Sequence, residues 1–305
     1  MKTNNRIKVV LTLCLIAVLG TPLVIQAQYE GSVFTGRYLR VGINNYGALG
    51  IYDSELGDVG FQYPIGGGYD AITPGWVGDA WAVFYGESEL GFSTSDSLWG
   101  NSSNITPTIS TQTLSDGYLR TITMRTDDGQ LQLTFKFRTY TDKKFLIVVA
   151  FIKNVGEGTI TDLEFKKNVD WDVWYNFGNY WGEDRIRKPA FNLAVAFNNA
   201  TNMEGGGQVY VGFASFEKPT SYDLDWGGEY DYYYRGMPAH PWQPVISSAG
   251  KSSWQNDGAA VYDWYLGTLS PGQTKAIHMV YAAGDTLQEL ETQTAMGWKL
   301  SLTIK

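Results

Sequence analysis

The segment from residue 130 to residue 140 alternates apolar and polar side chains, and this alternation limits the fold more than any other feature of the chain. Leu131, Leu133, Phe135 and Phe137 are separated by single polar or charged residues. Successive side chains of a β-strand point to opposite faces, so a period of two predicts a strand with one buried face. That face must be covered by a second layer of structure.

The next segment predicts a central strand. Phe145–Ile152 is wholly apolar and lies between lysines, which indicates a strand that is buried on both faces. Thr141 and Asp142 would form the turn of a hairpin that joins it to the strand over 130–140. Further strands are predicted at Val33–Ile43, Ala80–Tyr85, Tyr118–Arg125, Thr159–Val173, Phe191–Phe197, Gln208–Phe216, Val261–Leu266 and Gln273–Ala282.

The C-terminus and the longest linker complete the prediction. Asp285 can cap a helix over Thr286–Thr294, and Gly297 would end it. The alternating residues of Trp298–Lys305 predict a last strand. Gly86–Gly117 is rich in Ser, Thr, Asn and Gly and predicts a long exposed excursion.

Many short strands separated by Gly and Pro predict an all-β fold. We expect a large β-sandwich or two fused, supersandwich-like lobes, with one short C-terminal helix. Residues 28–305 would form one such domain, or two lobes that meet near Val155–Gly158. A chain of this length can bury a large core without disulfides or metals.

Residues 1–27 predict export. Basic residues without an acidic neighbour precede the apolar run Val9–Leu19, as in a signal peptide, and Ala27 suits the position before a cleavage site. An uncleaved membrane anchor is the alternative, because Val9–Ala27 nearly spans a bilayer. The chain after residue 27 contains no further segment long enough to span a membrane. We therefore expect a secreted or cell-surface, extracellular protein.

Cysteine content and charge exclude several kinds of chemistry and partner. Cys14 is the single cysteine and lies within the predicted signal, so the mature chain would have no disulfide and no thiol chemistry. Loss of the signal removes three positive charges and changes the formal net charge from −8 to −11. Such a surface repels nucleic acid and attracts cations. Asn101, Asn104 and Asn199 begin candidate glycosylation sequons.

Several short patterns resemble exported β-sandwich domains of prokaryotic surface and secreted proteins, in which a strand ends in an Asp-Trp-Asp motif. They are Arg40–Gly50, Lys153–Leu163, Val169–Val173, Leu266–Gly272 and Tyr281–Asp285. The resemblance implies a β-sandwich fold and an exported location. It implies no catalytic residue.

Two acidic groups suit calcium, which is the one cofactor that the sequence suggests. Asp170 and Asp172 would share one face of a strand, and calcium prefers oxygen ligands of this kind. Asp53, Glu55 and Asp58 form the second group. In the alternative interpretation, these carboxylates only accept hydrogen bonds at a polar strand end and in a solvated turn.

Aromatic residues concentrate in two stretches that also contain Asp, Glu, Asn and Gly. An aromatic ring can stack on the apolar face of a sugar while neighbouring polar groups bind its hydroxyls. These stretches are therefore candidate glycan-binding loops, although the same aromatics could simply anchor long loops. The candidate residues are Trp174, Trp181, Trp226, Tyr230, Tyr232 and Trp242.

The sequence assigns no catalytic residue. A glycosidase needs two carboxyl groups across a cleft, and a mutarotase-like isomerase would need paired histidines, of which only His240 and His278 exist. No nucleophile-elbow or zinc-binding pattern is present. The acidic residues available in the aromatic stretches are Glu183, Asp184, Asp223, Asp225 and Glu229.

Two functions follow from these patterns. The first is a non-catalytic structural, adhesive or self-assembling surface protein that pairs with copies of itself through edge strands, such as Val33–Ile43 or Trp298–Lys305. The second is a carbohydrate-binding module or a sugar-active enzyme, of the mutarotase or glycosidase kind. Aromatics that pack inward would favour the first function, and aromatics that line a groove would favour the second.

Overall fold

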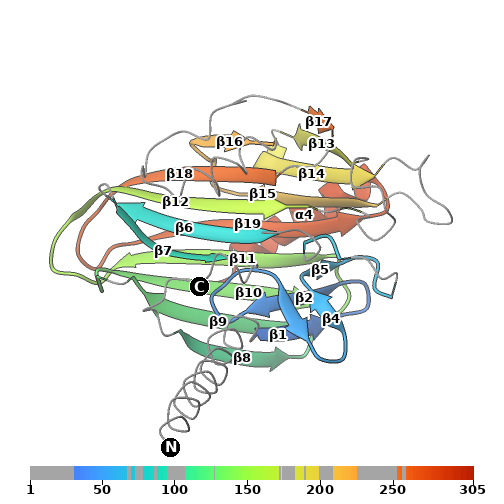
Figure 1. Cartoon of the computed structure of the whole chain (residues 1–305), viewed down its shortest axis with the longest axis horizontal. Coiled ribbons are helices and arrows are strands. Elements are labelled where there is room, and N and C mark those ends of the chain that lie inside the picture. The colour runs from blue at the N-terminus through green and yellow to red at the C-terminus, as the bar shows by residue number, and fades with distance from the viewer. Residues whose placement is uncertain are drawn as a thin grey trace, which may run out of the picture.

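The computed structural model describes residues 31–66, 70–72, 78–85, 88–94, 107–126, 128–171, 173, 183–188, 190–198, 209–224, 253–255 and 259–305. Over these ranges the chain consists of antiparallel strands and one α-helix, which confirms the predicted all-β class (Figure 1). The predicted signal peptide, residues 1–27, lies outside the described ranges. None of the helical structure in these ranges is both long and apolar enough to cross a membrane.

A nine-stranded antiparallel sheet forms the larger layer of the fold. The predicted hairpin is confirmed, because β10 and β11 pair antiparallel with Phe135 opposite Ala150. In spatial order the strands are β17 (Ser253–Gln255), β13 (Glu183–Lys188), β14 (Leu193–Asn198), β15 (Tyr210–Ser215), β19 (Thr274–Gly284), β11 (Phe145–Asn154), β10 (Leu131–Tyr140), β9 (Gly117–Arg125) and β8 (Thr108–Leu114).

A five-stranded sheet forms the second layer. In spatial order its strands are β16 (Ser221–Asp223), β18 (Ala259–Leu269), β12 (Ile160–Asp170), β6 (Asp79–Tyr85) and β7 (Ser88–Thr94). The chain passes from the larger sheet to the smaller one between β11 and β12. The segment Val155–Gly158, where two lobes were expected to meet, is therefore the connection between the two sheets.

The main core lies between the two sheets. Trp81 of β6, Phe135 of β10 and Phe165 of β12 are each at most 1% exposed, and their ring centroids lie 5.0–6.5 Å apart. Large aromatic rings bury the most apolar surface per residue and thus contribute most to such a core. The other face of β11, including Ile147 and Val149, belongs to a second apolar cluster. This strand is therefore buried on both faces, as its sequence predicts.

Two segments that were each predicted as a single element contain two strands each. Val33–Ile43 is not one strand but the hairpin β1 (Gly31–Thr35) and β2 (Arg40–Asn44), because the Gly36 N–H donates to the Leu39 carbonyl at 2.9 Å and closes a turn. Gly86–Gly117 is not one long excursion, since it contains β7 and β8. The remaining N-terminal strands are β3 (Ile51–Asp53), β4 (Gly57–Val59) and β5 (Phe61–Gln62).

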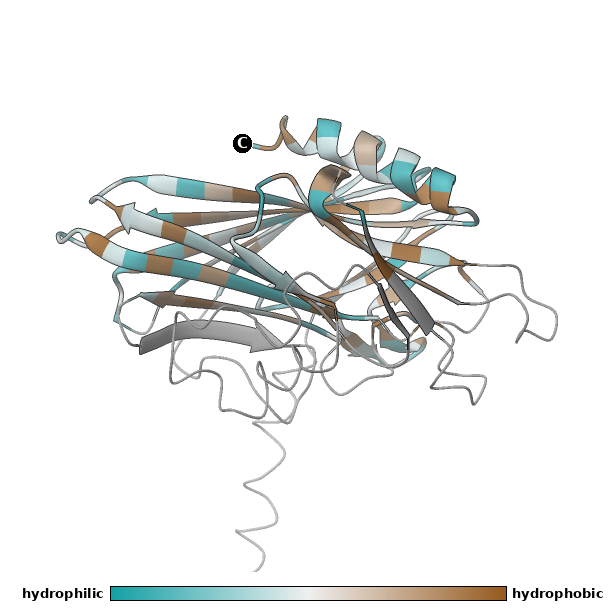
Figure 2. Ribbon diagram, turned by 90° about the horizontal axis from the view of Figure 1, so that it is seen from above, coloured by the Kyte–Doolittle hydropathy of each residue, from teal (hydrophilic) through white to brown (hydrophobic). Residues whose placement is uncertain are grey.

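Helix α4 (Leu287–Ser301) packs on the outer face of the nine-stranded sheet against β11, β15 and β19. Figure 2 shows it lying along one side of the strands. The residue that caps it is Thr286, whose Oγ1 accepts from the Glu289 N–H at 3.1 Å, and not Asp285.

The predicted terminal strand Trp298–Lys305 is wrong, because α4 continues through Gly297 to Ser301. A Cβ at Gly297 would lie 2.8 Å from Val280 Cγ1, so the glycine serves to bring the helix close to the sheet and does not end it. The buried residues of α4 recur at intervals of four, three and four, which is a helical period. Self-association through a C-terminal strand is thereby excluded.

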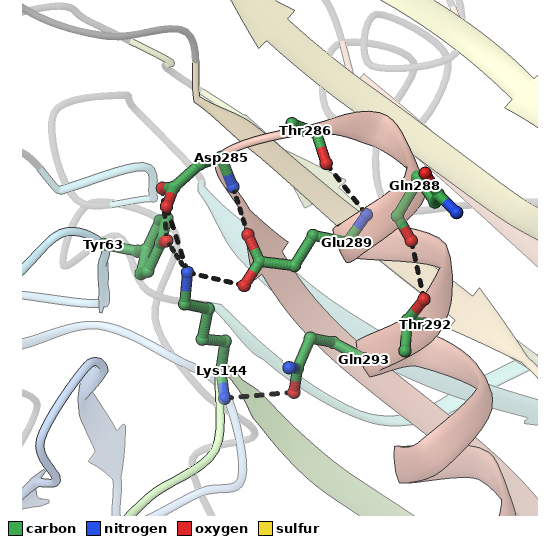
Figure 3. A network of polar contacts seen from close by, with 8 residues as sticks. All are labelled: Tyr63, Lys144, Asp285, Thr286, Gln288, Glu289, Thr292 and Gln293. Atoms are coloured by element: carbon green, nitrogen blue, oxygen red, sulfur yellow. Dashed lines mark hydrogen bonds and ion pairs between the residues drawn. The ribbon is translucent and has the colours of Figure 1, made fainter.

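A polar network fixes the N-terminal end of α4 to the rest of the molecule (Figure 3). Lys144 Nζ lies 2.7 Å from Glu289 Oε1 and 3.2 Å from Asp285 Oδ2, and it also contacts the Tyr63 hydroxyl. The Tyr63 hydroxyl donates to Asp285 Oδ1 at 2.5 Å. Burial opposes the charge of Lys144, but its bonds to Glu289 and Tyr63 outweigh this effect and raise the Lys144 pKa.

Candidate functional site

An aromatic pocket opens beside α4 on the outer face of the nine-stranded sheet. Its volume is about 110 Å³. This is smaller than the roughly 150 Å³ of an engineered cavity that admits benzene, so the pocket can take only part of a six-membered ring. The lining residues are Phe191, Asn192, Ala214, Ser215, Phe216, Val280, Thr294 and Trp298.

Three rings form the walls of this pocket. The centroid of Trp298 lies 5.0 Å from that of Phe216, at an interplanar angle of 32°, and 5.4 Å from that of Phe191, at 63°. Phe216 is 44% exposed, which is unusual for a phenylalanine. A ring that enters the pocket would therefore cover apolar surface that now faces solvent.

Polar side chains also line the pocket. The Trp298 indole Nε1–H is buried and has no hydrogen-bond partner among the described residues. The hydroxyls of Ser215 and Thr294 donate to the carbonyls of Glu217 and Leu290, each at 2.8 Å, so their oxygens remain able to accept. Ser215 and Thr294 are 2% and 0% exposed, so a ligand reaches these groups only when the ring contacts open.

The backbone at the mouth of the pocket is strained. Phe191 and Asn192 both adopt positive φ, 67° and 45°, although neither is glycine. Asn192 Nδ2 donates to the Ser215 carbonyl at 3.1 Å, and the Tyr262 hydroxyl donates to the Asn192 carbonyl at 2.8 Å. Strained residues that are held in this way concentrate at functional sites.

A histidine–glutamate pair supports the Phe216 wall. His278 Nδ1 lies 2.9 Å from Glu217 Oε1, and the His278 backbone N–H donates to Glu217 Oε2 at 2.6 Å. The Phe216 ring meets the His278 ring at 79° and 6.2 Å. The pair therefore fixes the position of Phe216. Among the residues that line the pocket in the described ranges, none carries a carboxyl group.

A second polar cluster lies on the outer face of the five-stranded sheet. Along β12, Phe165 and Val169 face the core, so Glu164 and Lys166 face the other way. Lys166 Nζ lies 3.1 Å from Glu164 Oε1 and 3.9 Å from Asp263 Oδ2 of β18. Glu164 is 1% exposed and Asp263 is fully buried.

Burial raises the pKa of both carboxyl groups of this cluster. Lys166 offsets only part of this effect on Glu164 and Asp263. Because both side chains are also closed to solvent, we assign the cluster to stability and not to ligand binding.

A third cluster joins the two sheets through the core. Asp79 Oδ2 on β6 accepts from Lys167 Nζ on β12 at 2.7 Å, and Asp79 Oδ1 accepts from the Tyr281 hydroxyl on β19 at 2.6 Å. All three side chains are at most 3% exposed. Burial raises the pKa of Asp79 and lowers that of Lys167.

The predicted calcium ligands are only partly described. Asp170 is buried at the end of β12, and Asp172 lies outside the described residues. Asp53 Oδ1 accepts from the backbone N–H groups of Glu55 and Leu56 at 2.9 and 3.0 Å, as a turn residue would. Asp58 lies on the paired strand β4. The described ranges contain no group of three or more acidic, His or Cys side chains that could hold a metal ion, and calcium binding stays a prediction.

All of the predicted glycan-binding and glycosylation residues lie outside the described residues. They are Trp174, Trp181, Trp226, Tyr230, Tyr232 and Trp242, and the sequon residues Asn101, Asn104 and Asn199. Asp225, Glu229 and His240 are also outside. Glu183 and Asp184 belong to β13, and Asp223 belongs to β16. Trp171 from the first aromatic stretch is described and is buried against Phe61 and Tyr281.

The aromatic pocket was not predicted from the sequence. Trp298 was predicted to lie in a strand, and Phe191 and Phe216, at the ends of predicted strands, were not predicted to bind a ligand. The available signal was the four-residue spacing of Thr294 and Trp298, which places both on one face of a continued helix.

Solved structures with a similar fold include several carbohydrate-active enzymes. A bacterial glucoamylase in complex with acarbose matches 91% of this chain with a TM-score of 0.50 and 11% identity. A GH36 α-galactosidase of Geobacillus stearothermophilus in complex with stachyose matches 88% with a TM-score of 0.44 and 8% identity. A candidate aldose 1-epimerase of Escherichia coli K12 matches 84% with a TM-score of 0.47 and 8% identity.

The match to the glucoamylase, at a TM-score of 0.50, establishes a likeness of fold alone. The chain spans 38% of the glucoamylase and 43% of the α-galactosidase, but 99% of the epimerase-like protein. No protein-family profile matches the sequence, so the resemblance to exported surface domains stays a prediction.

Proposed function

We propose that this protein binds carbohydrate outside the cytoplasm, and that the aromatic pocket holds part of one sugar ring. The observation that carries this proposal is the Trp298 indole N–H, which has no partner among the described residues and belongs to a side chain that lines a pocket with Phe191 and Phe216. A sugar ring has an apolar face for the aromatic walls and a hydroxyl oxygen to accept from the indole. The sequence features that predict export are the basis for the location.

Two further observations support a sugar as the ligand. The hydroxyl oxygens of Ser215 and Thr294 can accept from sugar hydroxyls, which a purely apolar ligand could not use. The fold is like that of a glucoamylase solved with acarbose, at a TM-score of 0.50. Together they favour the carbohydrate function over the purely structural one that the sequence also suggested.

The pocket supports binding better than catalysis. Glycoside hydrolysis uses two carboxyl groups that flank the bond to be cleaved, and the described lining supplies none. The volume of about 110 Å³ leaves no room for an extended chain and admits only part of one terminal ring. We therefore propose recognition of one exposed sugar unit of a glycan.

Affinity electrophoresis in gels that contain soluble polysaccharides tests the proposal. The wild-type protein should be retarded by at least one of them. Phe216→Ala should be retarded less, because it removes an exposed wall of the pocket and little of the core. Tyr52→Ala removes another exposed aromatic, 57% exposed and remote from the pocket lining, and should migrate like the wild type. Equal retardation of both variants, or none of the wild type by any glycan, would contradict the proposal.

A further inference from the structure

The strand β8 lies at one edge of the nine-stranded sheet, where Figure 1 shows it at the rim of the molecule. Among the described strands it pairs with β9 alone, in an unbroken register from Thr108 opposite Thr123 to Leu114 opposite Gly117. All of its side chains are exposed except that of Ile109, which is half-buried. No described strand occupies the backbone groups on its other side, where a further strand could pair.

The sequence of β8 lacks the features that normally protect a sheet edge. It reads TISTQTL and contains no charged residue, no proline and no glycine. Natural edge strands are usually shortened, bulged, or marked with lysine or proline to prevent pairing with another chain. Threonine and isoleucine also favour the extended conformation. This strand is thus open to addition of a partner strand.

We propose that a second copy of this chain pairs with β8, antiparallel and about a two-fold axis. Such an interface uses the same residues on both subunits, so the strand must be complementary to itself. With Thr111 on the axis, Ser110 faces the second copy's Gln112, and Ile109 faces its Thr113. The first pair joins two polar side chains and the second joins two β-branched side chains. Cross-strand pairs of both kinds stabilise neighbouring strands.

The net charge of the chain favours the uncharged strand β8 as the contact between two copies. Each chain carries a formal net charge of −8, so two copies repel each other over most of their surfaces. The neutral strand β8 brings no like charges together. The two copies would join their sheets into one continuous sheet, by the strand addition that many protein complexes use.

This inference does not depend on the proposed function. The pocket residues belong to β15, β19 and α4 and to the residues next to β14 and β15, whereas β8 ends the sheet on its other side. A dimer through β8 would leave both pockets open and would present two of them to one glycan surface.

Sedimentation velocity over a range of protein concentrations tests the inference, with charged variants of the two facing positions. The variant Ser110→Lys/Gln112→Lys places lysines opposite lysines in the two-fold register and should be a monomer. The variant Ser110→Glu/Gln112→Glu should also be a monomer. An equimolar mixture of the two should form a dimer, because each lysine then faces a glutamate.

The matched control adds the same charge elsewhere. Gln288→Lys/Thr292→Lys places two lysines on the exposed face of α4 and should dimerise like the wild type. A wild-type protein that stays monomeric at the highest concentration, a double-lysine β8 variant that still dimerises, or a mixture that does not dimerise would each overturn the inference.

Discussion

Replacing Lys167 by methionine is expected to lower the free energy of unfolding by about 3–5 kcal/mol, the usual cost of removing one partner from a buried ion pair. Lys167 is 3% exposed and Asp79 is fully buried, so the remaining Asp79 carboxylate could not be solvated. The Tyr281 hydroxyl and the Leu49 N–H would still donate to it, but neither supplies a positive charge. Urea unfolding at neutral pH measures the loss.

The double variant Lys167→Met/Asp79→Asn separates charge from packing. An asparagine keeps an acceptor for Tyr281 and removes the buried charge, so the double variant should be more stable than Lys167→Met alone. Tyr281→Phe serves as the milder comparison, since it removes one hydrogen bond to a charged group, worth about 1.5–3 kcal/mol. A Lys167→Met protein as stable as the wild type would refute the assignment of this buried ion pair as a stabilising contact of the core.

The raised pKa values of Glu164 and Asp263 should make stability fall as the pH rises. Their folded pKa values lie above the ordinary values of 4.5 and 3.8, so the folded state holds a proton that the unfolded chain releases. The free energy of unfolding therefore decreases as the pH rises from the ordinary carboxyl range through the raised folded pKa. One proton corresponds to at most about 1.4 kcal/mol per pH unit.

Glu164→Gln tests this linkage, because a neutral amide removes one of the two buried groups that titrate. The variant should gain stability over the wild type as the pH rises from about 5 to 8, at up to about 1.4 kcal/mol per unit. Glu157→Gln changes an exposed glutamate in the turn before β12 and should leave the pH profile unchanged. Parallel profiles for wild type and Glu164→Gln would contradict a raised pKa of Glu164 in the folded state.

The strands were predictable wherever local pattern and tertiary packing agree. The alternation at 131–137 and the apolar run at 145–152 each dictate one kind of strand, and both are confirmed. The pattern failed at Trp298–Lys305, where alternation over a few residues fits a strand and a helix face almost equally well. The close packing of Gly297 on Val280 favours the helix. That contact depends on the position of β19, which lies elsewhere in the sequence.

The candidate site was less predictable than the fold. The pocket joins Phe191, Phe216 and Trp298 from segments that are remote in sequence and adjacent only after α4 packs on the sheet. The carboxyl pair had a visible signal, because Asp263 stands alone in the apolar segment AAVYDWYL and Glu164 lies within a predicted strand. An acidic residue in such a position must find a partner, but the sequence does not reveal which residue that partner is.

The most direct test of the proposed function follows the Trp298 indole N–H by nuclear magnetic resonance during titration with methyl glycosides of common monosaccharides. Trp298→Phe identifies the signal by its loss and keeps an aromatic wall. The account predicts that one sugar shifts this signal in a saturable way, and that Trp298→Phe binds that sugar about 3- to 10-fold more weakly, as expected for one lost hydrogen bond. A sugar that binds the protein without moving the Trp298 signal, and with equal affinity for Trp298→Phe, would show that the aromatic pocket is not its site.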